Sequence, residues 1–147
     1  MAKQASQQST SEETLERTVS ENGIKVTIKS NHLSPGKTNS FFNPKMRQNR
    51  ELVLCSLATF AGESDGPLEC LDAFGATGIM GLQWAKHCNV RVVISDINEE
   101  STNLIKHNCR ENKMNVKGDD DVSENPCIEV VTCDVNVLMH QRAFDFM

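Results

Sequence analysis

The sequence predicts an α/β fold in which a parallel, doubly wound sheet is flanked by helices. Two observations support this prediction. Strand-like apolar runs alternate with helical patterns from residue 68 onward, an order that implies right-handed crossovers between parallel strands. The first of these runs also leads into a glycine turn, from Gly75 to Gly81, that opens a helix. Such a turn lets the backbone pass close to a nucleotide-like ligand.

The first 62 residues divide into two parts. We expect residues 1–21, rich in Ser, Thr, Gln and Glu, to form a disordered tail because they offer little apolar surface to bury. Residues 23–29 alternate apolar and polar side chains, which predicts a half-buried strand. Asn43 and Pro44 are typical of a helix start, and Gly62 of a helix end. Residues 22–62 are therefore interpreted as the N-terminal strand and helix of the domain.

Residues 63–147 carry the predicted sheet and form a partial, Rossmann-like cofactor-binding domain. Their periodicity predicts strands at 68–74, 90–96 and 128–134, and helices at 77–87, 98–112 and 135–140. The last residues, 143–147, are expected to begin a fourth strand. The acidic segment 116–126 is expected to be a mobile loop.

Composition and charge exclude several classes of protein. No run approaches the roughly eighteen apolar residues of a membrane span, and the N-terminus lacks a hydrophobic targeting core, so we expect a soluble intracellular protein. Cysteine and histidine spacing predicts no metal site. The net charge is −5. One segment nevertheless has only basic charges: Lys25, Lys29, Lys37, Lys45, Arg47 and Arg50. It is either a solvated face or an edge that meets a polyanion.

Three successive predicted strands end in an aspartate: Asp72, Asp96 and Asp134. Ligands of such sheets bind beyond the carboxyl ends of the strands, so we expect these acids to share a nucleotide-type site with Gly75 and Gly78. An acid before the glycine turn would repel a dinucleotide pyrophosphate. S-adenosylmethionine carries no phosphate, and its ammonium group suits Asp72. Asp96 is placed to accept the ribose hydroxyls, and Asp134 to accept the adenine amino group.

A nicotinamide-binding domain of the short-chain dehydrogenase type is the main alternative. Its Gly-x-x-Gly-x-x-Gly turn matches the residues from Gly75 to Gly81. Three observations count against it: Asp72 before the turn, about sixty residues of upstream sequence, and the absence of the tyrosine that usually donates the proton. S-adenosylmethionine is therefore the cofactor that we expect.

Several motifs together resemble one family, the tRNA guanine-N2 dimethyltransferases, and within it a vertebrate branch. The resemblance runs from about Glu21 to Met147. It rests on Phe41-Phe42-Asn43-Pro44 with Asn49-Arg50, Leu71-Asp72-Ala73 through Ala76-Thr77-Gly78-Ile79, Ser95-Asp96-Ile97, and Asp134-Val135-Asn136. It implies a class I methyltransferase fold and a nuclear protein. It also implies transfer of methyl groups from S-adenosylmethionine to the N2 of a guanine in tRNA.

The resemblance also implies roles for individual residues. From its surroundings alone Arg50 is interpreted as a surface arginine, whereas the resemblance makes it a contact to the cofactor. The basic segment becomes a face near RNA, with tRNA as the expected partner. The expected cofactor-binding residues are Arg50, Asp72, Gly75, Gly78, Asp96, Ile97, Asp134 and Val135.

Two departures from the family pattern bear on activity. Family members commonly have an arginine where this chain has Met80, so a cation near the cofactor carboxylate is missing. They also continue the fourth strand into an Asp-Pro-aromatic-Gly motif that holds the target amino group, whereas this chain ends at Met147. We therefore expect an incomplete, inactive fragment that retains the cofactor half and has no catalytic residue. A non-catalytic, truncated isoform that binds cofactor or RNA is the alternative.

Overall fold

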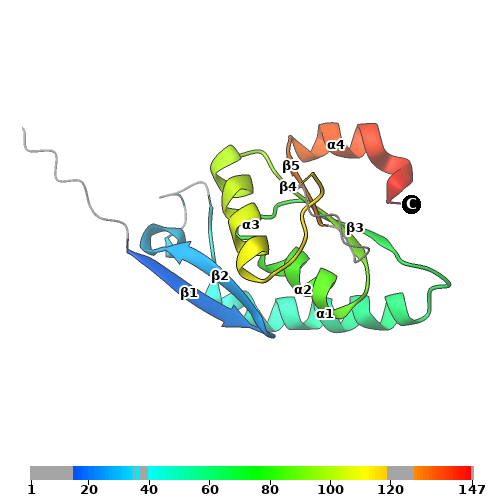
Figure 1. The fold of residues 1–147 in the computed structure, drawn as a ribbon, viewed down its shortest axis with the longest axis horizontal. Helices are drawn as coiled ribbons and strands as arrows, with labels where there is room; N and C mark the ends of the chain where they lie inside the picture. Colours follow the sequence, from blue (N-terminus) through cyan, green and yellow to red (C-terminus); the bar gives the residue numbers. More distant parts are fainter. Residues whose placement is uncertain (1–14, 35, 37–39, 119–127, 147) are drawn as a thin grey trace, which may run out of the picture.

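The computed structural model describes residues 15–34, 36, 40–118 and 128–146, which contain two sheets and the helices that pack on them (Figure 1). An antiparallel hairpin is made of β1 (Glu16–Glu21) and β2 (Ile24–Lys29). A parallel sheet has the order β3 (Glu69–Asp72), β4 (Arg91–Asp96) and β5 (Ile128–Thr132). The α-helices are α1 (Arg47–Gly62), α2 (Ile79–His87), α3 (Glu99–Glu111) and α4 (Val135–Arg142). The predicted parallel α/β fold is confirmed.

The main core lies between the parallel sheet, the helices α2 and α3, and the hairpin. Val92 and Ile94 of β4 pack there with Leu82 of α2 and Ile105 of α3, all of them buried. Since successive strand residues face opposite sides of a sheet, Val93 lies on the other face. Leu138 of α4 is buried outside this core cluster, and α4 lies across the sheet from α1 (Figure 1).

The expected disordered tail is wrong for its last six residues, which form β1. The turn between β1 and β2 is Asn22-Gly23, with φ values of 49° and 74°, the left-handed geometry that this dipeptide adopts in tight hairpins. β1 becomes ordered because it pairs with β2, which is fixed in the core by the fully buried side chains of Ile24, Val26 and Ile28. Residues 1–14 lie outside the described part of the chain.

Asn108 of α3 and Asn112, the C-cap residue of that helix, hold the hairpin against the domain. The backbone N–H of Thr27 donates to Asn108 Oδ1 at 2.9 Å, and the N–H of Lys25 donates to Asn112 Oδ1 at 2.9 Å. The Asn108 amide also donates to the carbonyl of Thr77 in the glycine turn, at 2.9 Å. The side chain of Asn108 is fully buried, so it links the hairpin rigidly to the turn.

The start and end of α1 follow the prediction. Asn43 is the N-cap of a short 3-10 helix, η2 (Pro44–Met46), that runs directly into α1, and its side chain accepts the N–H of Lys45 at 3.0 Å. The helix ends at Gly62. The apolar side chains of this helix are only partly buried; Val53, for example, is 40% exposed.

The expected fourth strand is not formed, because Ala143–Asp145 make a 3-10 helix, η3. Arg142 favours this compact turn, because it pairs with Asp145 at 2.6 Å and its guanidinium carbon lies 5.6 Å from the ring centroid of Phe146. Of the expected acidic loop at 116–126, residues 119–126 lie outside the described residues. No helix within the described ranges is long and apolar enough to cross a membrane.

Candidate functional site

The glycine turn joins the end of β3 to the start of α2 with tightly constrained backbone. Gly78 is the N-cap residue of α2 and has a φ of 81°, which favours glycine. The N–H of Gly75 donates to the carbonyl of Ser95 at 2.8 Å, so the turn is fixed against β4. A Cβ atom on Gly75 would lie 2.4 Å from Cγ2 of Ile94. No larger residue fits there without a shift of the core.

Asp72, the last residue of β3, is buried with only 7% of its surface exposed. Its Oδ2 accepts the N–H of Gly81, the third residue of α2, at 3.0 Å, and so satisfies one of the free donors at the helix start. Burial raises the pKa of Asp72 to about 6. The hydrogen bond from the N–H of Gly81 opposes this rise, the charge of nearby Asp96 adds to the rise, and the hydrogen bond from the N–H of Phe74 opposes it. A cationic group bound beside Asp72 would favour its ionised form.

Asp96 ends β4 beside the same turn. Its Oδ2 accepts the N–H of Ala76 at 3.0 Å, and its Oδ1 accepts the N–H of Asn98 at 2.9 Å. Ala76 has a φ of 47°, unusual for a residue with a side chain, and the bond from Asp96 helps hold that conformation. Each carboxylate oxygen has a second lone pair, so both still accept from a ligand hydroxyl.

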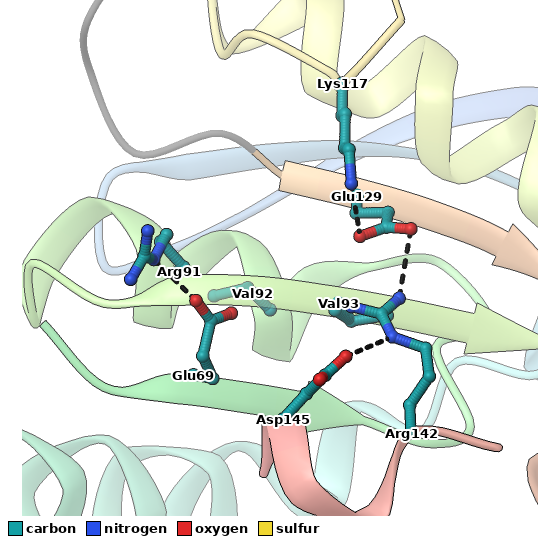
Figure 2. Close-up of a pocket in the computed structure, with 8 residues that line it drawn as sticks. All are labelled: Glu69, Arg91, Val92, Val93, Lys117, Glu129, Arg142 and Asp145. Atoms are coloured by element: carbon teal, nitrogen blue, oxygen red, sulfur yellow. Dashed lines mark hydrogen bonds and ion pairs between the residues drawn. The ribbon is translucent and has the colours of Figure 1, made fainter. Parts of the chain in front are cut away.

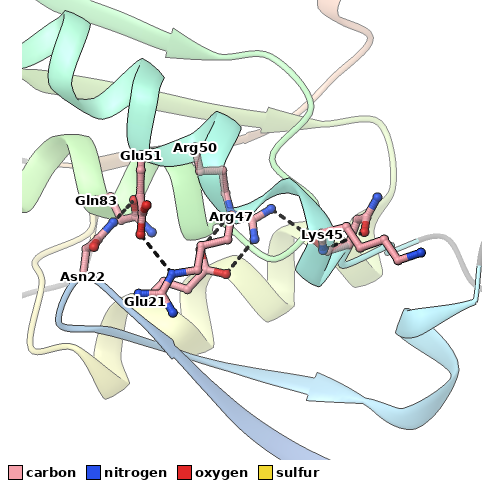
Figure 3. A network of polar contacts seen from close by, with 8 residues as sticks. Glu21, Asn22, Lys45, Arg47, Arg50, Glu51 and Gln83 are labelled. Atoms are coloured by element: carbon pink, nitrogen blue, oxygen red, sulfur yellow. Dashed lines mark hydrogen bonds and ion pairs between the residues drawn. The ribbon is translucent and has the colours of Figure 1, made fainter.

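Arg50 is not a surface residue, since only 7% of its surface is exposed. Its guanidinium makes a bidentate ion pair with Glu21 of β1: Nε to Oε2 at 2.8 Å and Nη2 to Oε1 at 2.6 Å (Figure 3). Nη1 donates to the carbonyl of Asn43 at 3.1 Å. The guanidinium carbon also lies 5.0 Å from the ring centroid of Phe42. Sequence reasoning missed Glu21, because it was assigned to the disordered tail.

A pocket of about 130 Å³ opens between the glycine turn and the segment that leads into α1. It brings together three of the expected site residues, Arg50, Asp72 and Gly75. Met80 lines it too, at the position of the expected arginine. The remaining lining residues are Phe41, Phe42, Asn43, Phe74, Ala76, Thr77 and Ile79. Arg50 is therefore the sole cation, and Asp72 the sole acid, among the described residues that line this pocket.

The other expected site residues lie outside this pocket. Asp96 is joined to it through Ala76, whereas Ile97 is 72% exposed beyond the end of β4. Asp134 is the N-cap of α4 and accepts the N–H of Asn136 at 2.7 Å, with Val135 half-buried beside it. The structure thus places one group of predicted residues around the glycine turn and a second group after β5.

A larger hollow, of about 410 Å³, lies against the sheet away from this pocket (Figure 2). Glu129 accepts from Lys117 at 3.3 Å and from Arg142 at 3.0 Å, and Glu69 pairs with Arg91 at 2.6 Å. Asp145 pairs with Arg142 as well. Every charged side chain that lines the hollow therefore has a partner of opposite charge. None of the expected site residues lines it, so we do not regard it as the cofactor site.

The basic segment is less basic in the structure than in the sequence. Arg50 pairs with Glu21, Arg47 pairs with Glu51 at 2.9 Å, and Lys29 pairs with Glu100 at 3.3 Å. All three acids lie outside the segment. Lys37 lies outside the described residues. Ion pairs therefore reduce the charge that this segment presents to a polyanion.

The curated proteins that this chain resembles have closely related names. The chain is 52% identical over 136 residues to a human tRNA (guanine(27)-N(2))-dimethyltransferase, covering 83% of this chain and 18% of that protein. It is 32% identical over 111 residues to a tRNA (guanine(26)-N(2))-dimethyltransferase of Methanosphaerula palustris, covering 76% of this chain and 25% of that protein. The chain thus spans a quarter or less of the length of these curated relatives.

Solved structures show the same fold. Trm1 from Pyrococcus horikoshii, in complex with S-adenosyl-L-methionine, aligns with a TM-score of 0.68 and 28% identity over 86% of this chain and 33% of that one. A methyltransferase from Agrobacterium tumefaciens aligns with a TM-score of 0.61 at 18% identity, over 86% of this chain and 35% of that one, and supports the fold alone. A sequence profile described as "N2,N2-dimethylguanosine tRNA methyltransferase" matches residues 17–147. The resemblance seen in the motifs is thereby confirmed, and the chain belongs to the N2,N2-dimethylguanosine tRNA methyltransferase family.

Proposed function

We propose that this chain forms the S-adenosylmethionine-binding part of a tRNA guanine-N2 methyltransferase. One observation carries the proposal: a pocket beyond β3 is lined by one buried acid and one buried cation, Asp72 and Arg50. The amino-acid portion of S-adenosylmethionine has an ammonium, which suits the acid Asp72, and a carboxylate, which can accept N–H groups of Arg50. At Gly75 a Cβ would clash with Ile94 and Ile105, so the glycine lets the turn that lines the pocket pack closely against β4 and α3.

The other predicted residues complete the proposed site. Asp96 accepts the ribose hydroxyls with the lone pairs that its two backbone bonds leave free. Ile97, exposed beside it, and Val135 offer apolar contacts to the adenine, and Asp134 accepts from the adenine amino group. When bound, the cofactor supplies a methyl group on a positively charged sulfur.

The target in this proposal is the N2 amino group of a guanine in tRNA, as the names of the relatives indicate. Its lone pair is delocalised into the ring, so catalysis depends mainly on orientation. Phe41 and Phe74, which line the pocket and are 38% and 79% exposed, offer rings on which a base can stack. We assign no described residue to the acceptance of the amino proton. The family resemblance also supports a nuclear location, which imaging of a tagged protein tests.

Cofactor binding is tested by calorimetry on the purified protein. Asp96→Asn removes one charged acceptor, and we expect S-adenosylmethionine affinity to fall about tenfold, the equivalent of about 1.4 kcal/mol. Glu100→Gln is the matched control, because it changes an exposed acid in the next helix. Unchanged affinity in Asp96→Asn, or preferential binding of NADH, would contradict the proposed site.

Methyl transfer is tested separately, with labelled S-adenosylmethionine and a tRNA transcript. Because no described residue is assigned to accept the amino proton, we expect no N2-methylated guanosine in the tRNA digest from this chain, as measured by mass spectrometry; its formation would contradict the expectation of an inactive chain. Cofactor binding without transfer supports the alternative of a non-catalytic binding protein. The two measurements therefore separate the cofactor site from the activity.

A further inference from the structure

Glu21 is a buried acid of β1 that contacts the pocket only through Arg50. Its side chain is 4% exposed and that of Arg50 is 8% exposed. Both carboxylate oxygens accept from the guanidinium, at 2.8 and 2.6 Å. A bidentate pair of this kind fixes the plane of the guanidinium as well as its position. Glu21 therefore decides which way Arg50 points.

The remaining donors of Arg50 are available to a ligand. A guanidinium has five N–H groups, and the bonds to Glu21 and to the carbonyl of Asn43 use three of them. One N–H on each terminal nitrogen has no hydrogen-bond partner among the residues that the structure describes. Arg50 lines the pocket, and the ring of Phe42 supports its guanidinium at 5.0 Å. Two remaining N–H groups on the two terminal nitrogens suit a planar, two-oxygen anion.

The hairpin turn next to Glu21 is bound by α2, the helix that starts at the glycine turn. It directly precedes the hairpin turn, whose Asn22 carbonyl lies 2.7 Å from Nε2 of His87 on α2. The amide of Asn22 donates to Gln83 at 3.2 Å (Figure 3), and Nζ of Lys86 donates to the carbonyl of Gly23 at 2.8 Å. The C-terminal half of α2 thus anchors the hairpin tip that carries Glu21.

We propose that Glu21 is a positioning residue, which holds Arg50 so that its two remaining N–H groups face the carboxylate of an amino-acid ligand group. This inference rests on the proposed function, in which that group belongs to S-adenosylmethionine. The Glu21–Arg50 pair carries no net charge, so Arg50 binds the carboxylate through directed hydrogen bonds rather than through excess charge. The exact placement of the guanidinium then determines affinity.

A pair of ligands isolates this role. S-adenosylhomocysteine has the amino-acid group, whereas 5′-methylthioadenosine shares its nucleoside and sulfur but lacks that group. We expect Glu21→Gln to weaken binding of S-adenosylhomocysteine at least tenfold, measured by calorimetry on the purified protein, and to change binding of 5′-methylthioadenosine less than twofold. Glu51→Gln is the matched control, because Glu51 pairs with exposed Arg47 on the same helix, and both affinities should remain unchanged.

Glu21→Asp separates position from charge and serves as the test if Glu21→Gln does not fold. It keeps the ion pair but shortens the side chain by one methylene, so the guanidinium must move. We expect the same selective loss of S-adenosylhomocysteine binding. Equal weakening of the two ligands, or unchanged or tighter binding of S-adenosylhomocysteine, would overturn the positioning role.

Arg50→Gln distinguishes this inference from the proposed function on which it rests. If Arg50→Gln weakens S-adenosylhomocysteine selectively and the Glu21 variants do not, only the positioning role is wrong. If Arg50→Gln also leaves the ratio of the two affinities unchanged, the proposed contact of Arg50 with the cofactor is wrong. Absence of S-adenosylhomocysteine binding to the unmodified protein would refute both.

Discussion

Asp72→Asn should stabilise the protein at neutral pH although it removes a proposed ligand contact. Burial raises the pKa of Asp72 from 3.8 to about 6, so the ionised carboxylate is disfavoured in the folded state. The gap of about two pKa units, at 1.36 kcal/mol each, corresponds to about 3 kcal/mol. Asn keeps an oxygen that accepts the N–H of Gly81 without the charge. At pH 7 the free energy of unfolding of the variant should therefore be about 3 kcal/mol higher than that of the unmodified protein.

The sign of the pH dependence follows from proton binding. Between pH 3.8 and about 6 the folded state binds more protons at Asp72 than the unfolded state, so this group's contribution to stability falls as pH rises. The advantage of Asp72→Asn should thus be small near pH 4, grow through pH 5 and 6, and level off above pH 7. Urea unfolding followed by circular dichroism at four pH values measures it.

Two comparisons make the Asp72 prediction refutable. Asp134→Asn is the control, because Asp134 caps α4 from an exposed position and Asn caps a helix about equally well, so a change below about 0.5 kcal/mol is expected. An Asp72→Asn variant that is no more stable at pH 7 would refute the reasoning, as would an advantage that is independent of pH. S-adenosylhomocysteine should also bind the variant more weakly, since its ammonium no longer meets a carboxylate.

Two neighbouring positions of α2 give further predictions. Gly81→Ala would place a Cβ 2.6 Å from Cδ1 of Ile94, so we expect its free energy of unfolding, measured with urea, to fall by about 1–3 kcal/mol. Gly62→Ala is the control, because there is open space around Gly62, and it should lose no stability. Equal stabilities of the two variants would contradict the packing argument. Met80→Arg adds a cation to the pocket lining, and calorimetry should show tighter binding of S-adenosylhomocysteine with 5′-methylthioadenosine unchanged; an equal shift for both ligands would contradict a carboxylate contact.

The elements that the sequence predicted well are those with local causes. Period-two and helical patterns, with caps such as Asn43 and Asn98, lie within a few residues of the structure they determine. The acids after the strands were also predictable, because a parallel sheet brings strand ends to one edge. That Asp72 and Gly75 line one pocket follows from this topology.

The first strand, β1, has a composition that hides its structure. All of residues 16–21 except Val19 are polar, and five of the six are partly or fully exposed in β1, so their composition resembles that of a disordered tail. The signal that identifies them is the Asn22-Gly23 dipeptide before the alternating residues of β2, a strong indication of a hairpin. Pairing with β2 orders this segment, although it buries little apolar surface of its own.

The environment of Arg50 was beyond any local pattern. Its partner Glu21 lies 29 residues earlier, in another element, and only the folded hairpin brings the two together. The same holds for Lys29 with Glu100, which are 71 residues apart. A count of charges within one segment assigned both cations to a basic face, but the folded chain compensates them with acids from elsewhere. What distinguishes the buried Arg50 is the set of donors that Glu21 leaves free, and those donors, rather than its formal charge, are what a ligand carboxylate would meet.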